Sequence, residues 1–321
     1  MGLLLPLVAV IAGLALLVWS ADHFIEGAIA LARRYAIPPV VIGLTLVAFG
    51  TSAPEIGVSL VAALTGSGSL ALGNVLGSNI ANFGLILGIT ALVCAMPIAR
   101  GTLRVELPLL LMASLLVWPL LMDGHLGIID GLLLCLLMAI TFFLLIRFGS
   151  AKDTLVAEAQ AAPALSRLRT AAYLVAGLIL LVISSRMLVW GAVELATAAG
   201  LSELVIGLTL VAVGTSLPEL SASLASALKG QSGMALGNIV GSNLFNLLLV
   251  LAIPALIGGV TVESLTLTRD YGSMALLTVI LLLFAWFGRL HHHLSRLEGG
   301  ILLLLYIGYS VLIVLTTRLG A

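Results

Sequence analysis

The amino-acid sequence predicts an all-α integral membrane protein with ten transmembrane helices, arranged as two inverted-topology five-helix repeats. Three observations predict this fold class. The 321 residues are 61% hydrophobic and only 9% charged, with a mean hydropathy of +1.27. Apolar runs of about 20 residues, long enough to cross a bilayer as helices, recur along the whole chain. A polar segment of the first half also returns in the second half.

Charged residues and Pro/Gly punctuation separate ten candidate spans. The spans cover residues 3–31, 40–65, 70–96, 105–122, 126–148, 168–198, 204–228, 234–258, 270–288 and 299–317. The first span has no basic start and no small-residue cleavage site, so we expect it to stay in the membrane. We expect a first five-helix repeat over residues 1–150, a cytoplasmic linker over 151–167 and a second, inverted five-helix repeat over 168–321.

The basic residues predict the orientation, because cytoplasmic loops hold the excess of Lys and Arg. With the N-terminus outside, eleven of the fourteen basic residues fall in inside loops. These are Arg33, Arg34, Arg100, Arg104, Arg147, Lys152, Arg167, Arg169, Lys229, Arg289 and Arg296. Both termini then lie outside. Because five spans per half is an odd number, the second half crosses the membrane in the opposite sense, as in alternating-access transporters.

The repeated segment is rich in polar residues. Gly50-Thr51-Ser52-Ala53-Pro54-Glu55 returns as Gly214-Thr215-Ser216-Leu217-Pro218-Glu219, an offset of 164 positions (219 − 55). Two residues related by this offset are called repeat mates below. From Val41 to Asn82, 26 of the 42 positions are identical to their mates. Polar residues repeated within a lipid-like sequence mark both the architecture and the working site, to which each half contributes one copy.

Each copy places a proline inside a predicted span. Proline has no backbone donor and its ring presses on the carbonyl four residues earlier, so the carbonyls near Gly50 and Gly214 lose their helical partners. Irregular backbone at membrane depth is tolerated only where it is buried in protein or lines a water-filled cavity. We therefore expect a kink or break in both helices, and freed carbonyls are cation ligands.

Glu55 and Glu219 follow these prolines at membrane depth. An ionised side chain at the bilayer centre costs about 2.5–3.5 kcal/mol on insertion scales. The cores of the repeat contain no Lys or Arg, and the nearest one, Lys229, lies at a loop. We infer that the missing positive charge is a transported ion held between two carboxylates, which one divalent ion would neutralise. The alternative is a purely structural network of buried carboxylates.

Amide and hydroxyl residues spaced four apart share one helix face in each half. They are Asn74, Ser78 and Asn82, and their mates Asn238, Ser242 and Asn246. Calcium takes about six to eight oxygen ligands of these kinds. Neither His nor Cys accompanies them, which disfavours zinc and copper. Cys94 and Cys135 lie in apolar segments and are expected to pack rather than form a disulfide.

The pattern Gly-Thr-Ser-x-Pro-Glu followed by Gly-Asn-x-x-Gly-Ser-Asn-x-x-Asn, present twice, closely resembles the calcium/cation antiporter superfamily. The chain is similar to a bacterial sodium/calcium exchanger-type protein along nearly its whole length. The resemblance implies ten helices, in which the second, third, seventh and eighth surround the ion sites while the first and sixth slide as a long tilted pair. It also implies calcium/sodium antiport across a bacterial-type inner (cytoplasmic) membrane, without enzyme activity or a cofactor.

The resemblance assigns ligands by position. Glu55 and Glu219 are the calcium carboxylates, and Thr51 and Thr215 lend backbone carbonyls. The sodium sites and the centre are completed by Ser52, Ser78, Ser216 and Ser242, with Asn82 and Asn246. Some members carry an aspartate at one central amide position, so this chain has one carboxylate fewer. The expected partners are calcium, sodium and membrane lipid, with no nucleic acid.

Several alternatives stay open. The hydroxyl set favours sodium as the counter-ion, with proton or potassium as alternatives. A calcium-permeable channel could use the same oxygens, but would pass calcium without a counter-ion. An intramembrane protease is disfavoured, because it would need a Ser/His pair or two aspartates at membrane depth and no His accompanies the repeated hydroxyls. A transporter of organic anions is disfavoured as well, because two carboxylates repel an anion. No Gly-rich phosphate loop is present, so active transport would draw on an ion gradient.

Other polar residues invite simpler interpretations. The Gly73–Gly77 pair and its mates Gly237 and Gly241 serve either close helix packing or ion access. Packing is also expected for Ser20, Ser184 and Ser185. Asp22 with His23 and Glu26 is expected at a solvated or interfacial cytoplasmic helix end, with a proton pathway as the alternative. His291-His292-His293 is expected in a wet cytoplasmic loop rather than at a metal site. Arg186 either pairs with Glu194 or snorkels to the surface.

Overall fold

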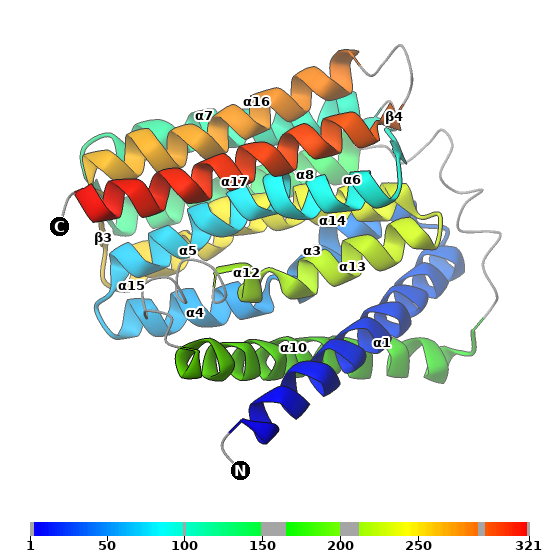
Figure 1. Cartoon of the computed structure of the whole chain (residues 1–321). Helices are drawn as coiled ribbons and strands as arrows, with labels where there is room; N and C mark the ends of the chain where they lie inside the picture. The colour runs from blue at the N-terminus through cyan, green and yellow to red at the C-terminus, as the bar shows by residue number, and fades with distance from the viewer. Residues whose placement is uncertain (1–2, 99–100, 149–164, 200–211, 288–292, 320–321) are drawn as a thin grey trace.

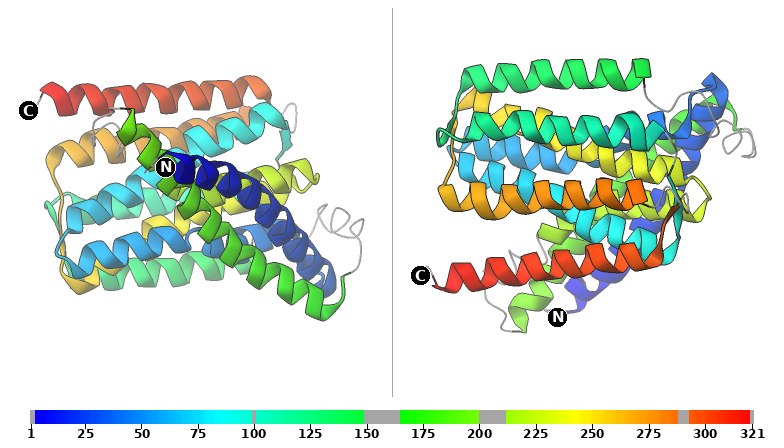
Figure 2. Two further views of the ribbon diagram at one scale, coloured as in Figure 1. Left: turned by 60° about the horizontal axis from the view of Figure 1, so that its bottom comes forward. Right: turned by 90° about the horizontal axis from the view of Figure 1, so that it is seen from above.

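The computed structural model describes residues 3–98, 101–148, 165–199, 212–287 and 293–319. These residues are overwhelmingly helical, with four two-residue strands among them. Elements keep the labels of Figure 1, and η marks a π-helical segment. Most of the long helices run roughly parallel to one another, while α1 and α10 lie side by side and run obliquely to the rest (Figure 2).

The chain order of the first half begins with a long helix and continues through a broken one. Its elements are α1 (Leu4–Tyr35), α2 (Pro39–Ile42), η1 (Gly43–Val47), α3 (Ala48–Thr51), α4 (Ala53–Leu64), α5 (Gly68–Ala81), η2 (Asn82–Leu87), α6 (Gly88–Val93), β1 (Met96–Pro97), η3 (Thr102–Glu106), α7 (Leu107–Leu121), β2 (His125–Leu126) and α8 (Ile128–Phe148).

The second half follows the same order. Its elements are α10 (Arg167–Ala198), α12 (Ala212–Thr215), α13 (Leu217–Leu228), α14 (Ser232–Leu244), η5 (Phe245–Val250), α15 (Ala252–Ile257), β3 (Val260–Thr261), η6 (Thr266–Tyr271), α16 (Gly272–Phe287), β4 (His293–Leu294) and α17 (Arg296–Leu319).

The described residues contain eight helical segments that are long and apolar enough to cross a membrane. A ninth is formed if Pro39–Thr51 and Ala53–Leu64, which meet at an angle of 45°, count as one broken span. These segments match nine predicted spans. Their boundaries differ by several residues, because helices such as α1 continue past the apolar core. The remaining predicted span, 204–228, begins outside the described residues, and its later part forms α12 and α13.

The predicted linker 151–167 lies mostly outside the described residues. Its last part is visible, and there Ser166 caps the start of α10: its hydroxyl oxygen accepts a hydrogen bond of 3.3 Å from the backbone nitrogen of Arg169. Such a cap satisfies one of the free amides of a helix start. Nearby, the guanidinium of Arg34 donates to the carbonyl of Leu165 at 2.9 Å, which ties the end of α1 to the chain before α10.

Glycines allow α1 and α10 to approach each other closely. A Cβ atom at Gly13 would lie 2.9 Å from the backbone nitrogen of Leu188, and one at its repeat mate Gly177 would lie 2.9 Å from the backbone of Phe24. Leu188 and Phe24 are themselves repeat mates (188 − 24 = 164). The missing side chains therefore bring the two backbones into contact at matched positions.

The spans 68–93 and 232–257 form the interior of the molecule. In their most apolar stretches 78% and 83% of the residues are buried, whereas the other long spans reach only 11–39%. Every residue of α14 is buried. The helices that carry the repeated Asn and Ser residues are therefore shielded by the surrounding helices rather than by lipid.

Glycines also make the turns that bring these helices together. Gly66 between α4 and α5 has a φ of 74°, and its repeat mate Gly230 between α13 and α14 has a φ of 71°. A side chain would be strained at these backbone angles. The tight turns place α4 against α5 and α13 against α14, so each glutamate of the repeat lies on a helix that packs beside the Asn/Ser helix of its own half.

Two short antiparallel strand pairs join the halves. In the first, Met96 of β1 faces Leu294 of β4; in the second, Leu126 of β2 faces Val260 of β3. The second pair is extended by a hydrogen bond of 2.8 Å from the nitrogen of Val262 to the carbonyl of Gly124. His293 of the predicted histidine loop thus belongs to a strand, while His291 and His292 lie outside the described residues.

Candidate functional site

Both prolines of the repeat lie at helix breaks, as the sequence predicts. The chain leaves the helix at Ser52 (φ −79°, ψ 5°) and at Ser216 (φ −90°, ψ 6°), and a new helix begins one residue later. Pro54 and Pro218 occupy the first turn of the new helices, where a missing backbone donor costs nothing. The two breaks therefore lie at equivalent positions in the two halves.

Glu55 and Glu219 lie in the first turns of α4 and α13. Their exposed fractions are 0% and 1%. A helix start favours a negative charge, because its free amides and the helix dipole are both positive there. The hydroxyl of Ser52, three residues before Glu55, is hydrogen-bonded to the carboxylate of Glu219, so the two glutamates lie near each other. The fold thus brings the repeated carboxylates together in the interior of the protein.

Serine hydroxyls of the first half hold one oxygen of each carboxylate. The hydroxyl of Ser52 donates to Oε1 of Glu219 at 3.2 Å, which crosses between the halves, and the hydroxyl of Ser78 donates to Oε1 of Glu55 at 3.5 Å. Among the described residues, Oε2 of neither glutamate has a hydrogen-bond partner. Each carboxylate therefore keeps one oxygen for another ligand.

Within the described ranges, no ion pair neutralises these carboxylates. Ion pairs between described residues join Lys229 to Asp22 at 2.7 Å and Arg269 to Asp270 at 2.7 Å. Neither includes Glu55 or Glu219. Taking two charges out of water without a counter-charge is costly, so these carboxyl groups must bind either protons or a cation.

Paired asparagines fix the helix turns that carry the glutamates. Asn238 donates to the carbonyl of Glu219 at 3.3 Å and to the hydroxyl of Ser223 at 2.8 Å. The repeat mate Asn74 makes the same two bonds, to the carbonyl of Glu55 at 3.4 Å and to the hydroxyl of Ser59 at 3.3 Å. These asparagines therefore use their NH2 groups to orient the first turns of α4 and α13.

Thr51 is tied into this arrangement as well. Its hydroxyl donates to Oδ1 of Asn238 at 3.2 Å and lies 3.4 Å from the carbonyl of Ala48. The first bond again crosses between the halves, and it leaves the backbone carbonyl of Thr51 as the group that the resemblance assigns to an ion. Its mate Thr215 is half-buried in the corresponding break.

The structure places the ten predicted site residues in one interior region. Nine of them are buried and Thr215 is half-buried. Hydrogen bonds connect the hydroxyls of Ser52 and Ser78 to the carboxylates, as described above. In the second half, the hydroxyls of Ser216 and Ser242 and the amide of Asn246 have no hydrogen-bond partner among the described residues. Buried polar groups of this kind normally find a partner.

Asn79 and Asn243 also contribute to the site, although the sequence analysis gave them no role. Asn82 donates to Oδ1 of Asn243 at 2.8 Å, and Asn79 donates to the carbonyl of Asn243 at 3.3 Å. All three are at most 1% exposed. The available signal was that both asparagines belong to the repeated motif Gly-Ser-Asn. This motif also contains the predicted ligands Ser78 and Ser242, so it does not show which residue binds an ion and which one positions a neighbour.

Three serines of the adjacent helices α1 and α10 serve packing, as expected. Ser20 and Ser184 donate within their own helices, each at 3.0 Å, to the carbonyls of Leu17 and Leu181. Ser185 of α10 donates to the carbonyl of Gly214 at 3.0 Å. This is one of the carbonyls predicted to lose a helical partner, so a neighbouring hydroxyl satisfies it.

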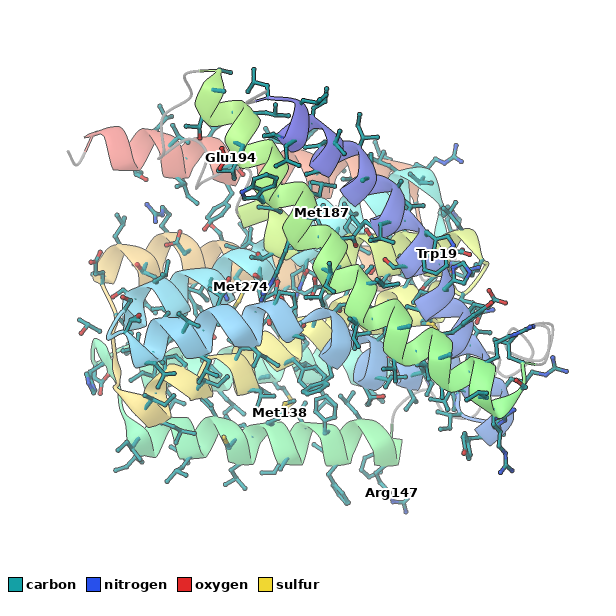
Figure 3. The ribbon with its side chains drawn as sticks, turned by 90° about the horizontal axis from the view of Figure 1, so that it is seen from below. Trp19, Met138, Arg147, Met187, Glu194 and Met274 are labelled. Atoms are coloured by element: carbon teal, nitrogen blue, oxygen red, sulfur yellow. The ribbon has the colours of Figure 1, made fainter. Side chains whose placement is uncertain are left out.

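Of the two alternatives for Arg186, the ion pair with Glu194 is not seen among the described residues. Both side chains are exposed on α10, and Glu194 lies toward the end of this helix (Figure 3). Asp22 at the other oblique helix is instead paired with Lys229. Repeat mates Asp22 and Arg186 therefore have different surroundings.

The glycine pairs differ between the halves. A Cβ atom at Gly237 would lie 2.5 Å from the carbonyl oxygen of Val40, and one at Gly241 would lie 2.5 Å from that of Leu44. These two glycines serve close helix packing. Their mates Gly73 and Gly77 have no atom within 4 Å of such a Cβ in the described part of the chain, and Gly73 is exposed.

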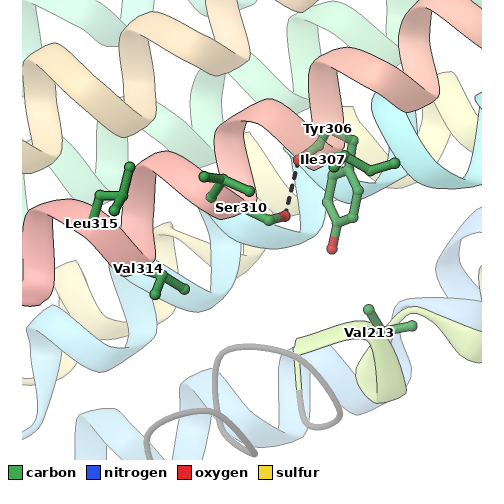
Figure 4. A pocket seen from close by; sticks show the side chains of 7 residues that line it. Val213, Tyr306, Ile307, Ser310, Val314 and Leu315 are labelled. Carbon is green, nitrogen blue, oxygen red and sulfur yellow. Dashed lines mark hydrogen bonds between the residues drawn. The ribbon is translucent and has the colours of Figure 1, made fainter.

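A cavity of about 410 Å³ lies between α12 and α17 (Figure 4). Val213 borders it on one side, and Tyr306 and Ser310 border it on the other. The Ser310 hydroxyl donates to the Tyr306 carbonyl at 2.9 Å. Because the lining is otherwise apolar, this cavity offers no oxygen ligands comparable to those around the two glutamates.

The chain is similar to known proteins along nearly its whole length. The family model described as "Sodium/calcium exchanger protein" matches residues 5–147 and 169–315. The chain is 43% identical over 317 residues to a protein named CaxA of Alkalimonas amylolytica, covering 97% of this chain and 99% of that protein. It is 40% identical to the inner membrane protein YrbG of Escherichia coli K12, with coverages of 88% and 90%.

Two further comparisons concern proteins that are named sodium/calcium exchangers. The sodium/calcium exchanger MaX1 of Methanosarcina acetivorans is 30% identical, with 94% of this chain and 96% of that protein covered. A solved structure of the sodium-calcium exchanger NCX_Mj has a TM-score of 0.82 and 31% identity, with coverages of 95% and 97%. The similarity thus spans nearly the whole of each chain.

Proposed function

This chain belongs to the sodium/calcium exchanger protein family, and on that basis we propose that it is a secondary active antiporter that exchanges calcium for sodium by alternating access. It is a multi-pass membrane transporter rather than an enzyme, and the family moves its ions without a cofactor. The ions are its substrates.

The observation that carries the proposal is the pair of buried carboxylates without a basic partner. Glu55 and Glu219 come from different halves, lie near each other and each keep one oxygen without a hydrogen-bond partner among the described residues. One calcium ion between them would supply the two positive charges that the described side chains do not. Cation binding therefore offsets the desolvation cost of the two buried carboxylates.

The surrounding oxygens support two kinds of cation. Calcium prefers about six to eight oxygen ligands, and the carboxylates with the oxygens of Asn82 and Asn246 offer part of such a shell. Ser216 and Ser242 add hydroxyls that lack partners among the described residues, and neutral oxygens of this kind suit sodium. The carbonyls of Thr51 and Thr215 complete the proposed set.

We further infer that the halves are inverted five-helix repeats, comprising residues 1–150 and 168–321 on either side of a cytoplasmic linker. The contacts of α1 with α10 support this, because Gly13 meets Leu188 as Gly177 meets Phe24. Exchange of mated positions in this way is expected from a twofold axis between the halves. The positive-inside distribution supports termini on the outer side of the membrane.

Packing around the site supports a conformation that is closed toward the cytoplasm. Gly237 and Gly241 press against η1 and the helix before it at Leu44 and Val40, whose repeat mates Leu208 and Leu204 lie outside the described residues. In the proposed orientation the tight contacts lie on the cytoplasmic side. Alternating access would then open these contacts and close the opposite face around the same two glutamates.

Calcium uptake into proteoliposomes tests the proposal. Vesicles loaded with sodium, potassium or an acidic buffer are diluted into medium with radioactive calcium, so that each outward gradient is imposed alone. We expect uptake with the sodium gradient and none in Glu55→Gln vesicles. Uptake driven only by the proton or potassium gradient would refute sodium as the counter-ion. Calcium entry without any counter-ion would identify a channel instead.

A further inference from the structure

Asn243 of α14 holds two amides of the opposite half. Its side-chain oxygen accepts a hydrogen bond of 2.8 Å from Asn82, and its backbone carbonyl accepts one of 3.3 Å from Asn79. The donors are one turn apart on the helical segment α5–η2, and Asn243 itself is 0% exposed. One buried residue therefore fixes two side chains that face it from the first half.

The bond to Asn82 decides which end of that amide is available. An Asn side chain has one oxygen and one NH2 group, and only the oxygen can bind a cation. Asn243 engages the NH2 group, while Oδ1 of Asn82 has no partner among the described residues. Reversal of the Asn82 amide alone would set two oxygens against each other at this contact, so Asn243 in its present orientation disfavours that reversal.

The corresponding bond in the other half is not made. Repeat symmetry would join Asn246 to Asn79, but Asn79 donates instead to Asn243 and to the sulfur of Met274 at 3.4 Å. Met274 lies on α16 (Figure 3), and its repeat mate is the apolar Leu110. Within the residues described, neither amide atom of Asn246 has a partner. The two central amides thus differ in their restraint.

We propose that Asn243 is a positioning residue, which turns the oxygen of Asn82 toward the transported cation. The proposal rests on the proposed function, because it assumes that a cation binds beside the glutamates. The segment η2, which begins at Asn82, packs against α13, the helix of the opposite half that carries Glu219 in its first turn. Asn82 is then an oriented ligand, whereas Asn246 is free to turn.

Equilibrium binding of calcium and of sodium to the purified protein tests this role. In Asn243→Leu the branched shape is kept and the acceptor is lost; in Asn243→Asp an acceptor oxygen is kept. We expect Asn243→Leu to weaken calcium binding about tenfold, and Asn243→Asp to stay within about threefold of the parent protein. Equal losses in both variants, or no loss in Asn243→Leu, would overturn the proposal.

A double-mutant cycle separates positioning from general damage to the core. Asn82→Leu removes the ligand itself, so adding Asn243→Leu to it should weaken binding by less than about twofold further. Independent, multiplying losses would overturn the proposal, because Asn243 would then not act through Asn82. Only protein that elutes as a single folded peak is assayed, and Asn243→Ser replaces Asn243→Leu if the latter does not fold.

The outcome is distinguishable from failure of the proposed function. If the parent protein binds sodium but not calcium, calcium/sodium exchange is refuted, and the same variants compared in sodium binding still test Asn243. If the parent protein binds calcium and the variants follow none of the expected differences, the positioning role alone is refuted.

Discussion

The hydroxyl of Ser52 donates a hydrogen bond of 3.2 Å to Oε1 of Glu219. The helix break of one half is thereby bonded to the carboxylate of the other. A movement of α3 against α4 must alter the surroundings of Glu219, and a cation bound at Glu219 must resist such a movement. This bond links cation binding to the conformation of the opposite half.

In the absence of cations, Ser52→Ala should therefore lower the stability of the protein more than its mate Ser216→Ala does. The first removes a buried hydrogen bond and should cost about 0.5–1.5 kcal/mol of stability. The second removes a hydroxyl that has no partner among the described residues, so it should cost less. Thermal unfolding of detergent-solubilised protein in cation-free buffer measures both. Equal losses of stability would contradict the assigned bond.

Glu55→Gln and Glu219→Gln should each abolish calcium exchange while the protein stays folded. A neutral amide keeps the shape of the side chain but leaves the site with one negative charge, which is too few for a divalent ion. Glu194→Gln, on the exposed surface of α10, is the matched control and should retain transport. Radioactive calcium uptake and gel filtration are the measurements. Parental flux in both variants would defeat the assignment.

Gly241→Ala should destabilise the protein far more than Gly77→Ala at the mated position. The new methyl of Gly241→Ala would lie 2.5 Å from the carbonyl oxygen of Leu44 and 2.7 Å from Cβ of Ala48, so the helices must separate. Overpacking of this kind costs about 1–3 kcal/mol, whereas Ala is favoured over Gly in a helix. Melting temperatures compare the two variants, and similar values would contradict the described packing.

Exchange of the two charges of the Asp22–Lys229 ion pair should preserve stability, whereas a change of one charge alone should not. The side chains are 49% and 28% exposed, so the pair contributes no more than about 1 kcal/mol. Asp22→Lys alone places two ammonium groups together and should lower the melting temperature. Adding Lys229→Asp should restore it. A double variant as unstable as the single one would show that the two charges do not interact.

Exchange of three sodium ions for one calcium ion would move one net positive charge per cycle. At about 2.3 kcal/mol per charge per 100 mV, an inside-positive potential of 100 mV should raise the calcium accumulation ratio about 50-fold. The sign follows from the three charges that leave for every two that enter. Valinomycin with set potassium gradients imposes the potential in sodium-loaded vesicles. Accumulation that ignores the potential would contradict this stoichiometry.

Much of the architecture could be predicted from the sequence, because its signals are local. The break at Ser52 follows from the position of Pro54, and the interior location of Asn82 follows from polar residues repeated in an apolar chain. Span boundaries were less predictable, because helices such as α1 extend past the apolar core to Arg33 and Arg34 before they end.

The connections between the halves could not be predicted. The letters around Ser52 and Ser216 are nearly identical, so sequence alone suggests equivalent bonds, yet only the first is seen bonded to a carboxylate among the described residues. The π-helical segment η2 begins at Asn82, and its wider turn shifts side chains that a regular helical spacing would align. Such differences arise from packing in one conformation rather than from local preference.

The two strand pairs have a consequence for biosynthesis. β1 is completed by β4, and β2 is completed by β3, so both partners of the first-half strands leave the ribosome only after most of the second half. The helices of the first half are therefore inserted before final assembly, and β1 and β2 stay without their partner strands until the second half is made. Two fragments divided between the repeats would recover the fold only when produced in the same cell.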